Sequence, residues 1–233
     1  GGPGGAAGGL GALVQGMLPG AMGGSAVVLV SNLDEECVSA DALFNLMSTC
    51  GNIVRIKILY QKRDSALVQF ESSEQAARAR ATLHGCPLWR RTLSVATSKH
   101  QTVQMRHGHA AQAEEDEEYL HGEYAGSPLN RFRGPSASHS SPIHPSRLLH
   151  VASVPSDMTQ PELTELFSSH GPVSRVKFLT PKAQDESRPA RSDRKMALLE
   201  LPSVQDAAEA ICSLHNFEVS GSRLRVSFSS SSL

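Results

Sequence analysis

The chain has 233 residues, a formal net charge of −1, 39% hydrophobic residues and 19% charged residues. This composition is ordinary for a soluble globular protein and excludes a collagen-like, wholly disordered or strongly cationic chain. Because no run of 18 apolar residues and no signal peptide occurs, we expect no membrane-spanning segment. The chain begins GGPGGAAGG, and we expect it to be a fragment that starts inside a linker.

Taken along the chain, one series of sequence patterns occurs twice. Each unit has apolar strands and amphipathic helices in the order β-α-β-β-α-β. The first unit is predicted at 27–33, 40–51, 53–60, 65–70, 74–85 and 91–96. The second is predicted at 148–154, 160–171, 173–179, 195–201, 204–216 and 223–228. The sequence therefore predicts an α+β protein with two tandem ferredoxin-like domains.

Composition sets the predicted boundaries of the domains and linkers. We expect a flexible Gly/Ala/Pro-rich linker, a first domain, an acidic then Pro/Ser-rich linker, and a second domain: 1–24, 25–105, 106–146 and 147–233. The first domain is mildly basic, whereas the second is balanced. Between strands two and three, we expect a tight hairpin at 61–64 and a mobile loop at 180–193.

The sequence contains no pattern typical of a metal site or an enzyme. Its four cysteines are widely spaced without a C-x-x-C pair, which favours free thiols in a reducing compartment: Cys37, Cys50, Cys86 and Cys212. Five of the ten histidines fall in the linker without ligand spacing: His107, His109, His121, His139 and His144. Since G-x-S-x-G, H-E-x-x-H and P-loop motifs are absent, we expect no enzyme activity, no metal and no cofactor.

Strand alternation predicts which face of each sheet meets water. Lys57 lies between Ile56 and Ile58, and a lysine is almost never buried without a partner. The isoleucines should therefore face the helices, while Lys57 and Leu59 face outward. The same alternation predicts further outward residues in the two sheets: Leu29, Ser65, Leu67, Gln69, His150, Lys177, Leu179, Met196, Leu198, Arg225 and Ser227.

The predicted open face of the first sheet is unusually apolar. A solvated sheet face normally carries polar residues, yet Leu29, Leu59 and Leu67 are all expected there beside Lys57. Exposed apolar groups ringed by positive charge suit a surface that stacks bases and neutralises phosphates. This pattern indicates a nucleic-acid-binding face.

Both units resemble RNA recognition motifs. The resemblance is carried by hexapeptides on strand one and octapeptides on strand three: VLVSNL (28–33), LHVASV (149–154), RDSALVQF (63–70) and RKMALLEL (194–201). In the common octapeptide two aromatic residues stack bases. Here their positions are occupied by other residues: Ser65, Leu67, Met196 and Leu198.

Other segments resemble the last two RNA recognition motifs of the polypyrimidine tract-binding protein family. They include strand and linker sequences: SALVQF, TSKHQTVQM, GSPLNRF, DRKMALLE and LRVSFS. The resemblance covers about residues 25–233. The heterogeneous nuclear ribonucleoprotein L family is its near relative.

The resemblance implies how such motifs bind RNA without the aromatic pair. The chain after the fourth strand, including Val103, would cross the first sheet and extend it as a fifth strand. Tyr60 and His150 would each stack a base, and Leu179 stands where the family has an aromatic residue. The implied RNA-binding residues are Leu29, Ser31, Lys57, Leu59, Tyr60, Leu67, Lys99, His100, Gln101, His150, Lys177, Leu179 and Arg225.

The resemblance also implies function and domain arrangement. It implies a nuclear protein, shuttling to the cytoplasm, that binds single-stranded pyrimidine-rich RNA and regulates pre-mRNA splicing with co-regulator proteins. It further implies packing of the two domains helix side to helix side, through Gln205, Ala208 and Cys212. The small residues at the last two positions leave independent domains as an alternative. We predict weaker RNA contact by the second domain.

A second hypothesis is a protein-interaction module that binds partners through its helix faces. An exposed apolar stripe on the helices would favour it. Such a stripe would include Ala208 and Cys212 with Leu83 or Met47.

Overall fold

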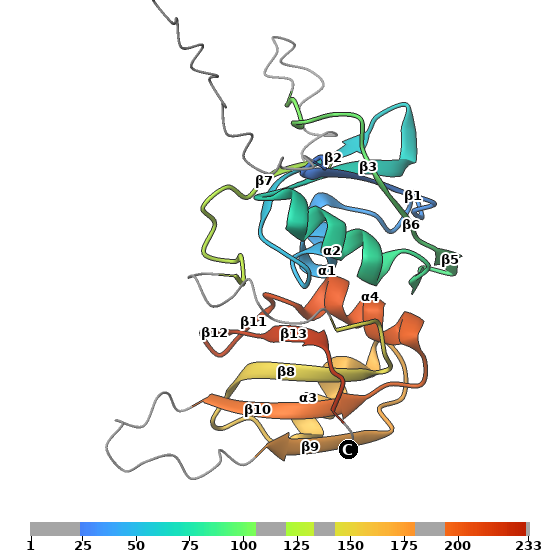
Figure 1. Cartoon of the computed structure of the whole chain (residues 1–233). Coiled ribbons are helices and arrows are strands. Elements are labelled where there is room, and N and C mark those ends of the chain that lie inside the picture. Colours follow the sequence, from blue (N-terminus) through green and yellow to red (C-terminus); the bar gives the residue numbers. More distant parts are fainter. Residues whose placement is uncertain (1–23, 106–119, 133–142, 180–193, 232–233) are drawn as a thin grey trace, which may run out of the picture.

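In the computed structural model, residues 24–105, 120–132, 143–179 and 194–231 are described. Figure 1 shows two sheets, one above the other, with α1, α2 and α4 between them. The β-α-β-β-α-β order predicted for each domain is confirmed. The N-terminal linker up to residue 23, most of the acidic run and the loop at 180–193 lie outside the described residues.

The first domain contains a five-stranded antiparallel sheet in the order β6-β1-β3-β2-β7. Its strands are β1 (Val27–Ser31), β2 (Ile53–Leu59), β3 (Lys62–Phe70), β6 (Ser94–Thr97) and β7 (His121–Glu123). Its helices are α1 (Ala40–Met47) and α2 (Ser73–Leu83). A small hairpin, β4 (Pro87–Leu88) and β5 (Arg91–Thr92), precedes β6.

The second domain contains a four-stranded antiparallel sheet in the order β13-β8-β10-β9. Its strands are β8 (Leu148–Pro155), β9 (Arg175–Leu179), β10 (Arg194–Glu200) and β13 (Arg225–Phe228). Its helices are α3 (Gln160–Ser168) and α4 (Val204–Leu214). Here too a small hairpin precedes the last strand, formed by β11 (Glu218–Val219) and β12 (Ser222–Arg223).

Several predicted boundaries were wrong. The expected hairpin loop at 61–64 is shorter, because β3 already begins at Lys62. The predicted last strands are each split between a small hairpin and a final strand. All four helices end before the predicted residue. In the first helix of each domain, the last predicted residues form turns. In the second helix of each domain, the residue after the helix, His84 or His215, has extended backbone angles.

Short polar side chains define where each helix begins. Ser39, Ser72 and Ser203 accept a hydrogen bond from the third following backbone N–H. Thr159 forms a capping box with Glu162 at the start of α3. Such caps satisfy backbone donors that a helix leaves unpaired, so the sequence fixes the helix starts locally.

Burial in the first sheet follows the predicted alternation. The side chains directed at the helices are almost completely buried: Val28, Val30, Ile56, Ile58, Ala66, Val68 and Phe70. Leu29, Leu59 and Leu67 are half-buried on the other face, as is Lys57. Ser65 differs from this pattern, since it is buried while its hydroxyl donates to the Asp64 carboxylate at 2.7 Å.

The second sheet follows the same alternation with one exception in exposure. Met196 is 40% exposed, as expected of an outward residue. Leu198 was also expected to be exposed, but it is only 4% exposed. It lies between His150 and Lys177 in the strand register. The longer neighbouring side chains limit its access to water.

The two domains contact each other through α1 and α4. The Asn45 amide donates to the Cys212 carbonyl at 2.8 Å and accepts from the Asn216 amide at 3.0 Å. The hairpin β4–β5 adds hydrogen bonds, including one from the Arg90 N–H to Gln205 Oε1 at 3.2 Å. Gln205 and Cys212 therefore lie at this contact, and Ala208, between them on α4, is buried. The short side chains leave room for direct hydrogen bonding between the helices.

Candidate functional site

A groove lies on the open face of the first sheet. Its volume is about 470 Å³, which lies within the range of ligand pockets. Its walls come from β2, β3 and the chain that follows β6: Lys57, Leu59, Leu67, Lys99, His100, Gln101, Thr102 and Gln104. Six of the residues implied by the family resemblance are therefore brought together in one place.

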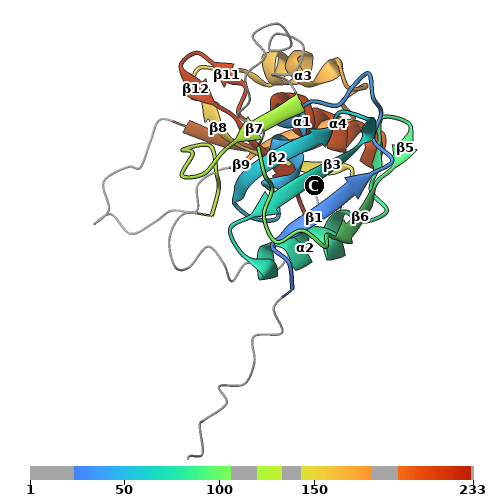
Figure 2. The same ribbon diagram turned by 90° about the horizontal axis from the view of Figure 1, so that it is seen from above.

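The segment after β6 crosses the sheet, as Figure 2 shows, and its residues line one wall of the groove. Near β1, the Ser25 hydroxyl donates to the His100 carbonyl at 2.5 Å. Over β3, the Val103 N–H donates to Gln69 Oε1 at 2.8 Å. Over β2, Lys57 Nζ donates to the Gln104 carbonyl at 3.0 Å. These bonds hold the segment over the open face from one edge toward the other.

The crossing segment is not the fifth strand that was predicted. Residues 98–105 have no strand structure, and the fifth strand is β7, which pairs with β2 through Arg55, Ile56 and Lys57. The crossing segment bonds mainly to side chains above the sheet, so it cannot form a ladder with β2.

One row of side chains runs across all five strands of the first sheet. Consecutive strand partners in this row are Ala96, Leu29, Leu67, Lys57 and His121. Partners in a sheet register point to the same face, so Leu29 extends the apolar floor beyond the groove. Sequence reasoning missed His121 and Gln104, because neither belongs to a recognisable strand pattern.

Tyr60 lies outside the groove, at the turn between β2 and β3. Its side chain is 63% exposed, and the Arg63 guanidinium lies 5.5 Å from the ring centre. An exposed ring beside a cation can stack a base. Ser31, at the end of β1, is half-buried beside Ser65 and Ser94 in the register.

The second sheet has an equivalent row of side chains, but different residues surround it. Ser227, His150, Leu198 and Lys177 are consecutive strand partners. His150 is half-buried, and its pKa is lowered by burial and by the nearby Arg131 charge. Its imidazole is therefore neutral at pH 7. Leu179 is half-buried opposite Met196.

Arg225 was predicted to contact RNA, but the linker already engages it. Its guanidinium donates to the Leu129 carbonyl at 2.8 Å and to the Pro128 carbonyl at 3.3 Å. Nearby, the Arg131 guanidinium contacts the buried His215 ring and the Val226 carbonyl. The linker thus lies against the last strand of the second domain, where a phosphate was expected.

The same linker is bound to the first domain. The buried Asn130 side chain accepts from the Ile53 N–H at 2.9 Å and donates to the Ile53 carbonyl at 3.0 Å. Asn52 makes a similar pair of bonds with the backbone of Phe132. Residues 127–132 therefore connect both domains by specific hydrogen bonds.

The described residues contain no chemistry typical of metal binding. They include no group of three or more His, Cys, Asp or Glu side chains that could hold an ion, and all four cysteines are free. Burial raises the pKa of Cys50 to about 11 and that of Cys86 to about 12, so both thiols stay protonated. Among the described residues, the helices are too short or too polar to cross a membrane.

The apolar stripe proposed for protein binding through the helix faces is not exposed. Met47, Leu83, Ala208 and Cys212 are each at most 4% exposed. They are covered within the domains or by the α1–α4 contact. The feature that would have favoured the second hypothesis is therefore absent from the described helices.

Comparison with known families gives two matches that follow the two domains. A family model described as RNA recognition motif, also known as RRM, RBD or RNP domain, matches residues 5–127. A second RNA recognition motif model matches residues 149–225.

Two curated proteins are similar over most of the chain. Polypyrimidine tract-binding protein homolog 3 of Arabidopsis thaliana is 34% identical over 203 residues, which cover 87% of this chain and 42% of that protein. Heterogeneous nuclear ribonucleoprotein L of Homo sapiens is 26% identical over 198 residues, which cover 84% of this chain and 32% of that protein. The chain thus spans less than half the length of either relative.

Among solved structures, a Sxl-lethal protein/RNA complex matches 88% of this chain and 99% of its own chain. The sequence identity is 19% and the TM-score is 0.30.

Proposed function

Because the chain belongs to the RNA recognition motif family, we propose that its first domain binds single-stranded, pyrimidine-rich RNA in the groove on the open sheet face. The observation that carries the proposal is the groove itself. An apolar floor, two lysines and a row of polar groups converge there. Aromatic side chains are not needed for this arrangement.

The floor and the cations have separate roles in this proposal. Leu59 and Leu67 offer an apolar surface on which a small pyrimidine ring can lie. Lys57 and Lys99 provide positive charge for the phosphates on either side. Because neutralised phosphates release counterions, binding should weaken as salt increases. Tyr60, which follows Leu59 but lies outside the groove, adds a stacking surface.

The crossing segment would supply base recognition. The Gln101 and Gln104 side-chain amides can donate and accept, as can backbone groups of residues 99–104. Uracil O4 and N3, or cytosine N4 and N3, present matching groups on the Watson–Crick edge. Single-stranded RNA exposes these edges, whereas a duplex hides them.

The second domain would contribute less to RNA binding. Arg225 is engaged by the linker, and His150 is neutral and half-buried. Lys177 and Leu179 remain as weak contact groups beside Met196. A single RNA that reaches both sheets would gain affinity from the linkage of the two sites.

The process we propose is nuclear control of mRNA processing, including pre-mRNA splicing. It is supported by similarity to a polypyrimidine tract-binding protein homolog and to heterogeneous nuclear ribonucleoprotein L. Shuttling to the cytoplasm and recruitment of splicing co-regulator proteins belong to the same proposal. The protein would act by binding, without catalysis.

The test is titration of the two-domain chain with labelled CUCUCU and with an all-purine hexamer. We expect tighter binding of CUCUCU and amide shifts along residues 98–104, β2 and β3. Lys99→Gln should weaken binding about threefold and reduce the salt dependence. Arg80→Gln removes an exposed charge from α2 on the opposite face, so it should leave affinity unchanged. Equal binding of both hexamers, or shifts confined to the helices, would reject the proposal.

A further inference from the structure

The two sheets differ at one equivalent edge. In the first domain, β2 is covered by β7, so it is an inner strand. In the second domain, β9 occupies the corresponding position and has β10 as its strand neighbour in the described part of the chain. An edge strand presents unpaired backbone groups that can accept another strand.

The first domain covers its edge with its own linker. Glu123 pairs with Arg55 in the register and forms an ion pair with it at 3.0 Å. The Tyr124 N–H donates to the Val54 carbonyl at 2.8 Å. The Tyr124 ring stacks on Phe44 with 4.1 Å between ring centres. An extended segment and one aromatic side chain therefore seal the space between β2 and α1.

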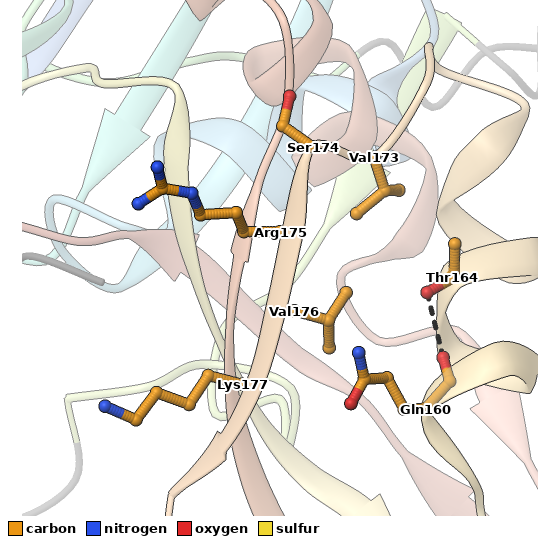
Figure 3. A pocket seen from close by; sticks show the side chains of 7 residues that line it. All are labelled: Gln160, Thr164, Val173, Ser174, Arg175, Val176 and Lys177. Atoms are coloured by element: carbon orange, nitrogen blue, oxygen red, sulfur yellow. Dashed lines mark hydrogen bonds between the residues drawn. The ribbon is translucent and has the colours of Figure 1, made fainter.

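The corresponding space in the second domain is an open groove. When Gly51 is aligned with Gly171, Phe44 aligns with Thr164, and Ile53 and Ile56 align with two valines. A groove of about 340 Å³ lies at these positions, lined by Gln160, Thr164, Val173, Ser174, Arg175, Val176 and Lys177. Figure 3 shows Val173 and Val176 pointing toward α3, and Arg175 and Lys177 pointing away from it.

Exposure supports this equivalence. Ile53 and Ile56 are fully buried in the first domain. Val173 and Val176 are half-buried, although they align with these isoleucines and are also apolar. The groove floor therefore has the composition of a core surface, but among the described residues it lacks the cover that the first domain provides.

We propose that this groove binds an extended peptide from a protein partner, which adds a strand to β9. The peptide would place an acidic residue opposite Arg175, as Glu123 lies opposite Arg55. The next residue would be apolar and would pack on Val173 and Val176. Main-chain pairing gives affinity in this mode of recognition, and the side-chain groove gives specificity.

The charges and side chains at this edge favour an acidic and aliphatic peptide. Arg175 and Lys177 are both exposed at this edge, and the Arg175 guanidinium is 3.9 Å from Glu200. A tyrosine fits less well than in the first domain, because Thr164 replaces the ring on which it would stack. Pro161 replaces Asp41, which accepts from the Tyr124 hydroxyl at 2.8 Å. The peptide would therefore carry leucine or isoleucine at this position.

This surface is distinct from both sites considered above. It lies at the β9 edge beside α3, whereas α4 is the helix of this domain that contacts the first domain. The groove floor also faces away from the open sheet face that carries His150 and Met196. Peptide binding is therefore independent of the RNA-binding proposal, and each can fail without the other.

The first experiment uses a probe derived from the chain itself. A peptide with the sequence of residues 120–126 carrying Tyr124→Leu is titrated into the two-domain chain without RNA. We expect amide shifts in residues 160–164 and 173–177, with little change in β1 and β3. Shifts confined to other surfaces, or no binding at millimolar peptide, would overturn the proposal.

Variants test the two contacts separately. Arg175→Glu should weaken binding of the probe about fivefold, and a Glu123→Lys probe should recover most of that loss. Arg223→Glu is the matched control, because Arg223 is an exposed arginine on a hairpin away from the groove. Equal loss in both arginine variants would contradict the assigned contact.

A gain of function gives the sharpest test of the groove. Thr164→Phe combined with Pro161→Asp restores the two groups that hold Tyr124 in the first domain. This variant should bind the unmodified 120–126 peptide at least threefold more tightly than the unsubstituted chain does. An unchanged preference would overturn the equivalence of the two edges. Concentration-dependent dimerisation through β9 without peptide would also overturn the proposal, since a second copy would then be the occupant.

Discussion

The two domains share one fold, yet they present different surfaces, because the chain outside their cores takes different paths. After β6, the first domain's chain returns over its own sheet and builds a groove. After β7, the same chain seals the sheet edge with Tyr124 and then bonds to the second domain. The second domain has neither addition in its described residues. Its groove lies at the edge beside α3 instead.

The residues that fold each domain differ from the residues that give it a binding surface. Alternating apolar residues in β1, β2 and β3 are matched in β8, β9 and β10, so both cores form in the same way. The functional differences come from short segments with little pattern of their own. Variants in those segments should therefore change binding or edge stability while leaving the opposite domain intact.

The largest loss of stability is expected when the edge cover of the first domain is removed. Tyr124→Ala removes a buried ring that stacks on Phe44 and a hydrogen bond to Asp41. We expect a loss of about 3 kcal/mol in the unfolding free energy of the first domain. Urea unfolding followed by amide signals of β2 and β9 would resolve the two domains.

Tyr60→Ala is the control for that variant. Tyr60 is exposed, so its removal should change stability by less than about 0.5 kcal/mol. If the two tyrosine variants had equal effects on stability, β7 and Tyr124 would not be the cover described here.

A smaller loss of stability is expected at acid pH, and it should occur in the second domain. His84 and His215 occupy equivalent positions after α2 and α4, and each Nδ1 accepts from a strand N–H at 3.1 Å. His84 is exposed, whereas His215 is buried against Arg131. Burial, together with the charges of Arg131 and Arg225, lowers the pKa of His215 far below its ordinary value.

A histidine with a lowered pKa binds its proton more weakly in the folded state than in the unfolded state. Its contribution to stability is therefore complete above about pH 6.5 and falls as the solution becomes more acidic. Between pH 7 and pH 5 we expect the second domain to lose about 2 kcal/mol. His215→Gln should remove most of this dependence, and His84→Gln should leave it intact. A pH-independent second domain would contradict the buried neutral imidazole.

Much of this architecture can be predicted from local sequence. Lys57 between two isoleucines identified the open face, and serine or threonine caps mark each helix start. The β7 strand could not be predicted, because His121–Glu123 is three residues long without alternation, and its register depends on the distant Tyr124–Phe44 contact. Engagement of Arg225 by the linker is equally non-local. The β9 groove depends on the lack of such a cover in the part of the chain that the structure describes, which no pattern in β9 itself reveals.

An intermediate effect on RNA affinity should distinguish the two sheet faces. Lys57→Met keeps the apolar stem but removes the charge and the bond to the Gln104 carbonyl, which holds the crossing segment. We expect CUCUCU affinity to fall about fivefold, equivalent to about 1 kcal/mol. Lys177→Met, the equivalent change in the second sheet, should lower affinity less than about twofold. Fluorescence anisotropy at fixed salt measures both, and equal losses would show that the crossing segment does not distinguish the domains.

The smallest expected effect concerns the ion pair at the covered edge. Glu123→Gln removes the partner of Arg55, but both side chains are partly exposed, at 50% and 35%. A pair of this kind contributes about 0.5 kcal/mol at most, and salt screens it. Urea unfolding at low and high salt should show a small loss that disappears at high salt. A loss as large as that of Tyr124→Ala would mean that charge rather than apolar packing holds an added strand at this edge. The peptide bound at β9 would then be selected mainly by its acidic residue opposite Arg175.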